Sequence, residues 1–187
     1  VADLADEKQR WPQFVPAARN TGVARASARW VAFCDDDDLW APDKLACQLG
    51  DLAPMGTRWA STGVVEVNEK LDIVGHHRAK GGEVLSALLE ENLIPSGSSV
   101  IADLRLVRQL GGFDPMLNGS EDWDLWIRLA QHSRLAAVDR PLIAYRLGRS
   151  SVSMDIERMR TGRAIIVDRY APLATERGVI PTELKHE

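Results

Sequence analysis

Four consecutive aspartates at positions 35–38 follow a short apolar run over residues 30–34, which is typical of a buried strand. Consecutive side chains on an extended segment point to opposite sides, so Asp35 and Asp37 are expected to share one face. Mg2+ and Mn2+ prefer oxygen ligands, and proteins commonly hold them with one or two carboxylates plus substrate phosphates. Because a cation also relieves the repulsion between adjacent negative charges, the cluster predicts a site for a divalent metal and a phosphorylated ligand.

A solvated acidic turn that caps a helix beginning near Pro42 is the structural alternative for these aspartates. An EF-hand is excluded because its further oxygen ligands, its sixth-position glycine and its distal glutamate are missing. Aspartyl phosphatases carry a similar pair of aspartates, but Thr or Val normally follows it, whereas Leu39 and Trp40 stand here. The sequence also lacks a P-loop, a dinucleotide fingerprint, a serine nucleophile elbow and a zinc-spaced set of Cys and His residues.

A second acidic group, made of Glu121, Asp122 and Asp124, opens a helix expected over residues 121–132. Ser120 is a typical N-cap residue, and acidic side chains are favourable near the positive end of a helix dipole. On these residues alone, helix capping explains the group, and the tryptophans at 123 and 126 are interpreted as core residues. A chemical role for the group depends on additional evidence.

The elements that position both groups follow from apolar periodicity. Strands are expected at residues 30–34, 57–67, 98–102, 135–138 and 142–145. Helices are expected at residues 17–29, 82–92, 104–110, 121–132 and 156–170, with another beginning near residue 42 whose Leu45, Leu49 and Leu52 share one face. This alternation indicates an α/β fold with a largely parallel sheet, and it puts the aspartates beyond the carboxyl end of a strand, where open α/β sheets bind ligands.

Composition narrows the class of protein further. The 187 residues fit one domain, and a net charge of −4 argues against a general nucleic-acid binder. No apolar run approaches the roughly 20 residues that span a bilayer. Cys34 and Cys47 are too few for a disulfide framework and are expected to be buried thiols in a reducing compartment. The expected location is cytoplasmic.

Three groups of residues, in this order along the chain, resemble family-2 glycosyltransferases of the GT-A fold. The metal-binding stretch of that family is similar to Asn20-x-Gly22 and Phe33-Cys34-Asp35-x-Asp37-Asp38-Leu39-Trp40-x-Pro42-x-Lys44-Leu45. Its acceptor-side and catalytic-base segment is similar to Gly111-Gly112-Phe113-Asp114 and Glu121-Asp122-Trp123-Asp124-Leu125-Trp126-x-Arg128-Leu129. Its strand and flexible loop over the diphosphate are similar to Pro141-Leu142-x-x-Tyr145-Arg146 and Ser151-x-Ser153.

The resemblance implies a nucleotide-diphospho-sugar transferase with a Rossmann-like GT-A fold. Asp35 and Asp37 would hold Mn2+ or Mg2+ and the donor diphosphate. Asp122 would be the general base of an inverting transfer, with Glu121 orienting it. Arg146 and Arg149 would steady the leaving group. The acceptor side would be formed by Trp123, Gly112, Phe113 and Asp114. A UDP-sugar is the expected donor, and a saccharide or lipid-linked saccharide the expected acceptor.

Two features depart from the family pattern. The family begins with strands that precede this sequence, so residues 1–154 are expected to be a catalytic domain lacking its first strands, followed by a helical extension over residues 155–187. The strand at 30–34 is then expected to lack a full set of neighbours. Gly148 also stands where many members place a metal-binding histidine.

Three alternatives remain open on the sequence. A non-catalytic nucleotide-sugar or carbohydrate-binding module of the same fold is the main competitor of the enzyme. A sugar-nucleotide pyrophosphorylase is a second enzyme class with a related substrate. A peripheral contact with an anionic membrane, at the inner face, is a further expectation. It rests on four arginines of the last helix, Arg158, Arg160, Arg163 and Arg169.

Overall fold

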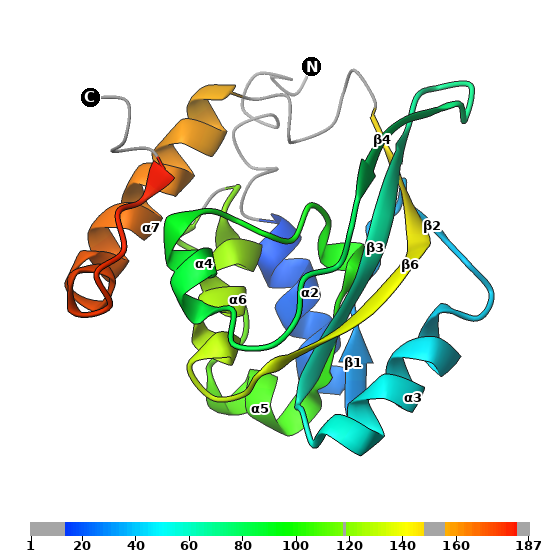
Figure 1. Ribbon diagram of the computed structural model, residues 1–187, viewed down its shortest axis with the longest axis horizontal. Helices are drawn as coiled ribbons and strands as arrows, with labels where there is room; N and C mark the ends of the chain where they lie inside the picture. Colours follow the sequence, from blue (N-terminus) through cyan, green and yellow to red (C-terminus); the bar gives the residue numbers. More distant parts are fainter. Residues whose placement is uncertain (1–13, 118, 148–155, 183–187) are drawn as a thin grey trace, which may run out of the picture.

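The computed structural model describes residues 14–117, 119–147 and 156–182 (Figure 1). Its strands are β1 (Trp30–Ala32), β2 (Leu39–Trp40), β3 (Trp59–Val67), β4 (Ile73–His77), β5 (Ile101–Asp103) and β6 (Leu135–Arg146). Its helices are α2 (Phe14–Arg25), α3 (Lys44–Met55), α4 (Leu85–Glu90), α5 (Leu104–Gln109), α6 (Glu121–Ala130) and α7 (Ile156–Glu176), with a 3-10 turn η2 (Gly97–Ser99). Strands and helices are interspersed as the apolar pattern predicts, so the α/β class is confirmed.

The described strands form one sheet in the order β1-β5-β3-β6-β2, with β4 beside β3. The prediction of a largely parallel sheet is wrong for these strands, because four of the five pairings are antiparallel. Only β3 and β6 run parallel, and the long stretch between them supplies the crossover that a parallel pair needs. Within the described part of the chain, β1 pairs with β5 alone.

β6 is a single strand where the sequence predicts two. Pro141 suggested a break, but the pairing with β3 continues past it, with Thr62 opposite Val138 and Gly63 opposite Pro141. The extra residues of β6 bulge at this point. A Cβ atom on Gly63 would lie 2.9 Å from the carbonyl oxygen of Arg140, so the glycine permits the close approach.

Helices cover both faces of the sheet. Figure 1 shows α2, α4, α5 and α6 on one side and α3 on the other. The larger core lies on the first side around Trp59 and Trp126, whose rings stack with centroids 6.1 Å apart. A smaller core lies under α3 and includes Leu52 and Ala60. Trp59 and Ala60 are neighbours in β3, so the alternation of the strand supplies both cores.

The buried face of α3 differs from the predicted leucine face. Leu45 and Leu49 are 39% and 40% exposed, while Lys44, Gln48 and Leu52 are buried. The Gln48 amide donates to two carbonyl oxygens, in β3 and in η2, at 3.2 and 2.8 Å. Lys44 Nζ donates to Gln48 Oε1 at 2.8 Å. Polar side chains therefore attach this end of α3 to the sheet, which hydrophobic spacing alone does not reveal.

α7 is longer than predicted and shares the larger core. Its Ile166 and Ala174 are buried in that core, and the helix packs against α4 (Figure 1). The prediction of two buried thiols is wrong, because β1 ends at Ala32 and leaves Cys34 in an exposed loop, while Cys47 is half-buried. Among helices in the described ranges, none combines the length and apolar content needed to cross a bilayer.

Candidate functional site

The four aspartates form a turn, not the extended segment that the sequence suggested. The backbone N–H of Asp38 donates to the carbonyl oxygen of Asp35 at 3.3 Å, which places Asp36 and Asp37 at the tip. The turn lies between β1 and β2, which occupy opposite ends of the strand order. The turn therefore gives these aspartates different exposures. Asp36 is exposed, whereas Asp35 and Asp37 are half-buried.

Asp38 is the structural member of the cluster. It is buried, and its Oδ2 accepts a hydrogen bond from the Ser96 hydroxyl at 2.7 Å. Burial raises the pKa of Asp38, although hydrogen bonds from Ser98 and Ser96 oppose the rise. The Ser98 hydroxyl also accepts from the backbone N–H of Asp35 at 2.9 Å. The segment around η2 therefore supports the acidic turn from both of its ends.

Arg19 of α2 connects the two acidic groups. Its Nη2 donates to Asp35 Oδ1 at 2.6 Å, and its Nη1 donates to Glu121 Oε1 at 3.1 Å. The guanidinium also lies 5.2 Å from the centre of the Phe113 ring. Asp35 and Glu121 are thus bound by the two terminal nitrogens of one guanidinium. The structure joins the two groups that the sequence had singled out separately.

Glu121 and Asp122 have different environments at the start of α6. Both oxygens of Glu121 are occupied, since Oε2 also accepts from the backbone N–H of Gly119 at 3.0 Å. Asp122 Oδ1 accepts from the N–H of Trp123 at 2.6 Å, and no other partner of the Asp122 carboxylate is seen in the described residues. Desolvation by the surrounding protein, followed by repulsion from Glu121, raises the pKa of Asp122 to about 7. Asp122 is therefore suited to exchange a proton near neutral pH.

The loop before α6 is fixed by Asn20 of α2. The backbone N–H of Phe113 donates to Asn20 Oδ1, and Asn20 Nδ2 donates to the carbonyl oxygen of Phe113, both at 2.8 Å. Gly112 has a φ of +70°, and a Cβ atom there would lie 2.4 Å from Asn20 Oδ1. Both the backbone conformation and the close contact therefore favour a glycine at this position.

Two of the predicted acceptor-side residues lie in the core. Phe113 is 1% exposed and packs edge-to-face on Phe33, with ring centroids 4.9 Å apart. Trp123 is 3% exposed, and its indole N–H donates to the carbonyl oxygen of Leu88 at 2.7 Å. Neither ring is presented to solvent, so each can influence an acceptor only through the position of the backbone around it.

The Asp114 side chain is more accessible, but both of its carboxylate oxygens already accept hydrogen bonds. Its Oδ1 accepts from the backbone N–H of Met116, and its Oδ2 accepts from Arg169 Nη2, both at 2.8 Å. These partners keep the pKa of Asp114 below its ordinary value, although burial opposes them. Asp114 therefore shapes the loop that leads to α6.

Of the two arginines predicted to steady a leaving group, Arg146 is described and Arg149 lies outside the described residues. Leu39 of β2 lies opposite Ala144 of β6, so Arg146, two residues further along β6, extends toward the acidic turn. Its Nε is buried and has no hydrogen-bond partner in the described protein. Arg146 thus has one guanidinium donor, Nε, without a partner in the described residues.

The donor set of the acidic turn fits a small divalent cation. Asp35 and Asp37 supply hard carboxylate oxygens, and the buried Oδ1 of Asp38 has no hydrogen-bond partner in the described residues. The described chain holds no group of three or more His, Cys, Asp or Glu side chains arranged around a metal position. The turn therefore fits an ion that takes one or two protein carboxylates and fills its shell with phosphates and water.

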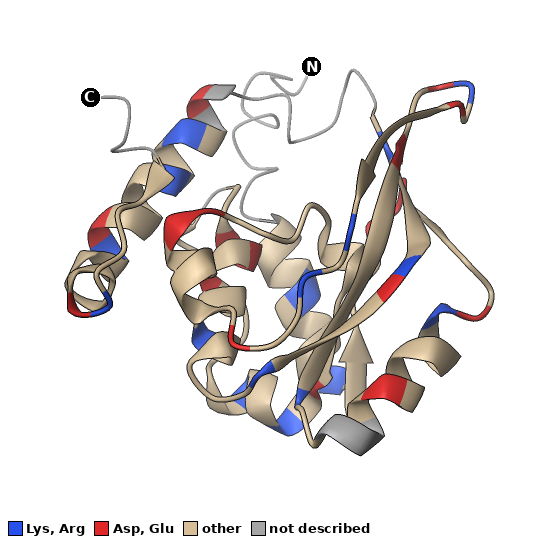
Figure 2. Cartoon of the chain, viewed as in Figure 1, with Lys and Arg blue, Asp and Glu red and all other residues tan. Residues whose placement is uncertain are grey.

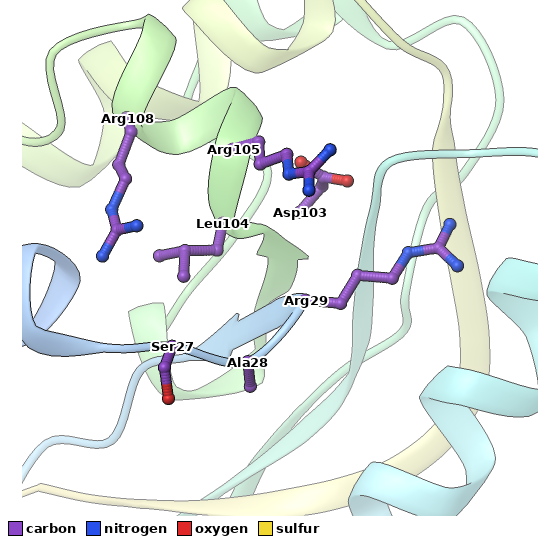
Figure 3. A pocket seen from close by; sticks show the side chains of 7 residues that line it. All are labelled: Ser27, Ala28, Arg29, Asp103, Leu104, Arg105 and Arg108. Atoms are coloured by element: carbon purple, nitrogen blue, oxygen red, sulfur yellow. The ribbon is translucent and has the colours of Figure 1, made fainter.

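A cavity of about 610 Å³ lies elsewhere. Its lining consists of Ser27, Ala28, Arg29, Asp103, Leu104, Arg105 and Arg108. Figure 3 shows Arg105 and Arg108 projecting from α5 above the segment that leads into β1. That segment precedes β1, whereas the acidic turn follows it, so the cavity lies at the other end of this strand. Guanidinium donors of Arg108 are bound to carbonyl oxygens of residues 23, 24 and 26.

Sequence reasoning missed Arg19, Ser96 and Ser98. All three are polar residues without a distinctive local pattern, and their roles depend on contacts with residues far along the chain. A signal was present only for Arg19, which directly precedes the Asn20-x-Gly22 pattern.

Comparisons with known proteins identify the family of the chain. The model of the family described as "Glycosyltransferase like family 2" matches residues 3–161. The Escherichia coli UDP-Glc:alpha-D-GlcNAc-diphosphoundecaprenol beta-1,3-glucosyltransferase WfgD is 30% identical over 138 residues, which cover 73% of this chain and 53% of WfgD. An uncharacterized glycosyltransferase of Rickettsia felis is 26% identical over 149 residues, 78% of this chain and 24% of that protein.

Solved structures show the same fold. Staphylococcus aureus TarS in complex with UDP-GlcNAc matches with a TM-score of 0.59 and 12% identity, over 79% of this chain and 44% of that chain. The TarS complex with UDP matches with a TM-score of 0.58 and 12% identity, over 81% and 43%. The chain thus spans between about a quarter and about half of these proteins. The chain belongs to the glycosyltransferase like family 2 and has the α/β GT-A fold that its sequence predicts.

Proposed function

We propose that this chain takes part in moving a sugar from a nucleoside diphosphate donor to an acceptor hydroxyl, with inversion at the anomeric carbon. The observation that carries the proposal is the bridge of Arg19 between Asp35 and Glu121. It supports a single site in which the acidic turn handles the donor and the start of α6 handles the acceptor.

On the donor side, Asp35 and Asp37 are the proposed residues for Mn2+ or Mg2+ and the diphosphate. A bound divalent ion would offset the negative charge that develops on the departing diphosphate. Arg146 would add a guanidinium donor to the same group, and its unpaired Nε supports this role. Asp38 is hydrogen-bonded to Ser96 through Oδ2, so that oxygen supports the turn and is not assigned to the ion. A UDP-sugar is the proposed donor because WfgD uses UDP-Glc and TarS binds UDP-GlcNAc.

On the acceptor side, Asp122 is the proposed general base. Its carboxylate would take the proton of the acceptor hydroxyl while that oxygen attacks the anomeric carbon from the face opposite the diphosphate. The bond to the diphosphate oxygen breaks as the new glycosidic bond forms, and its electron pair leaves with the diphosphate. Glu121 would not compete for the proton, because both of its oxygens are hydrogen-bonded.

The acceptor is proposed to be a saccharide, with a lipid-linked saccharide as the more specific candidate. The name of WfgD specifies a diphosphoundecaprenol-linked acceptor. The arginines of α7 give limited support for a membrane contact, because Arg169 is engaged by Asp114 and Asp124. Figure 2 also shows acidic and basic positions interspersed along α7.

The test measures release and transfer of the sugar by the intact protein with Mn2+ and a panel of sugar nucleotides. The Asp122→Asn variant should bind donor normally, keep its melting temperature and lose transfer by about 10²-fold or more, the usual contribution of a general base. Asp51→Asn on α3 is the matched control, since Asp51 is exposed, and it should keep wild-type activity. Donor binding without turnover in the wild type would favour the binding module, and full transfer by Asp122→Asn would move the base elsewhere.

A further inference from the structure

The carboxylate of Asp124 accepts hydrogen bonds from three side chains near the site, those of Arg128, Arg169 and Tyr170. It is 1% exposed, although it lies in the first turn of α6. Its Oδ2 accepts from Arg128 Nε at 2.7 Å, and its Oδ1 accepts from Arg169 Nη1 and the Tyr170 hydroxyl, both at 2.8 Å. Asp124 therefore joins α6 to α7, a role beyond the helix capping that the sequence suggested for the acidic group.

Both arginines that bind Asp124 also donate hydrogen bonds to the loop that precedes α6. Arg128 donates to the carbonyl oxygens of Leu110 and Gly112, at 2.7 and 2.8 Å. Arg169 donates through its second terminal nitrogen to Asp114 Oδ2 at 2.8 Å. The loop is thus held from α6 by Arg128 and from α7 by Arg169, while α2 holds it through Asn20.

The Arg169 contact is the one that reaches the accessible part of the loop. Asp114 is 25% exposed in its side chain, and it turns the chain through its bond to the N–H of Met116. Met116 is 81% exposed and stands between Asp114 and the acidic pair in sequence. Arg169 is 36% exposed and supplies one guanidinium to two carboxylates from different elements. Because a planar guanidinium fixes both partners at once, it sets the distance between this loop and α6.

We propose that Arg169 is a positioning residue for acceptor binding, which holds the loop of residues 111–117 beside the acidic pair by joining Asp114 to Asp124. The inference rests on the proposed function and assigns α7 a part in the acceptor side. Arg169 touches no reacting atom in this scheme. It acts through Asp114, whose two oxygens are both engaged and which therefore shapes the loop.

The test separates acceptor binding from donor chemistry in the intact protein. Arg169→Gln should raise the acceptor KM about tenfold or more, the effect of losing a charge-assisted hydrogen bond, while donor hydrolysis without acceptor stays within about twofold. Asp114→Asn should raise the acceptor KM in the same way and leave the contacts of Asp124 in place. The effects of the two changes on the acceptor KM should not add, because both remove the contact between Arg169 and Asp114.

Two controls are matched to these variants. Arg177→Gln alters an exposed arginine just beyond the end of α7 and should change neither measurement. Tyr170→Phe removes a hydrogen bond to Asp124 but leaves the Asp114 contact, so it should lower the melting temperature without raising the acceptor KM.

An acceptor KM within twofold of wild type in both Arg169→Gln and Asp114→Asn would overturn this inference and leave the proposed function standing. Parallel loss of donor hydrolysis and transfer in these variants would reduce Arg169 to a stabilising role. A wild-type protein inactive toward every sugar nucleotide would instead overturn the proposed function, and the inference with it.

Discussion

Arg19 donates a hydrogen bond of 2.6 Å to Asp35, which ties the helix before β1 to the acidic turn after it. The same guanidinium reaches Glu121, and its positive charge lowers the pKa of Asp122 against the effect of burial. A single side chain thus affects both halves of the proposed reaction. Its removal is the most informative change at the site.

Arg19→Gln should lower the transfer rate by about tenfold or more, since it removes two charge-assisted hydrogen bonds. It should also move the acid limb of the pH–rate profile to higher pH, because Asp122 loses the positive charge that favours its ionised form. The measurement is kcat/KM between pH 5.5 and 9 for both proteins. Arg25→Gln, at an exposed position of the same helix, is the control. An unchanged profile would show that Arg19 does not act on the base.

Asp122 itself sets a second pH expectation. A pKa of about 7 means that Asp122 is protonated, and unable to accept a proton, below neutral pH. With the donor saturating, kcat/KM for the acceptor should therefore fall about tenfold for each pH unit below about 7. An unperturbed aspartate would stay ionised down to about pH 4. Constant activity between pH 5 and 8 would contradict the assignment of Asp122 as base.

The sequence predicts the elements better than their pairing. Apolar periodicity finds the strands and helices because each buries a face, but the direction of pairing depends on connections and partners far along the chain. Gly63 is an example: it lets β6 continue through Pro141, and nothing near Pro141 reveals this.

The candidate site likewise contains residues that a local pattern reveals and residues that only the folded structure reveals. Asp35, Glu121 and Asp122 could be selected from local patterns, because acidic residues after a strand or at a helix start have a local signature. Arg19 and Arg169 could not, because their roles arise only where helices distant in sequence meet. Asp124 has the same local signature as Asp122 but is buried under two arginines, and only packing distinguishes the two.

Gly112 allows a test of the loop geometry. Gly112→Ala should lower the free energy of unfolding by about 2 kcal/mol or more, because a left-handed alanine costs about 1 kcal/mol and the new Cβ displaces Asn20. Gly111→Ala is the matched control, since its φ is +83° but no atom lies within 4 Å of its Cβ position. It should show the conformational cost alone. The measurement is urea unfolding of both variants.

A double-mutant cycle with Asn20 isolates the cost of the contact between the new Cβ atom and Asn20. In an Asn20→Ala background the additional cost of Gly112→Ala should shrink toward that of Gly111→Ala, because the clashing oxygen is gone. Equal costs in both backgrounds would mean that the loop avoids the clash by moving.

Lys44 gives the last prediction, which concerns stability and not turnover. Its ammonium group is fully buried, donates to Gln48 Oε1, and lies 4.1 Å from the centre of the Trp40 ring. Desolvation lowers the pKa of Lys44 from 10.5 to about 8 in the folded protein. Between these two pH values the unfolded chain binds more protons than the folded one, so raising the pH should stabilise the fold. The gain in the free energy of unfolding is at most about 3 kcal/mol, at about 1.4 kcal/mol for each unit of pKa.

Urea unfolding at pH 7.5 and pH 10 should show this rise in stability in the wild type and its loss in Lys44→Met, which keeps a side chain of similar length without the charge. Lys80→Met removes an exposed lysine and should keep the wild-type rise. If Lys44→Met has the same dependence on pH as the wild type, the buried ammonium is stabilised fully by its neighbours, and its burial carries no cost at neutral pH.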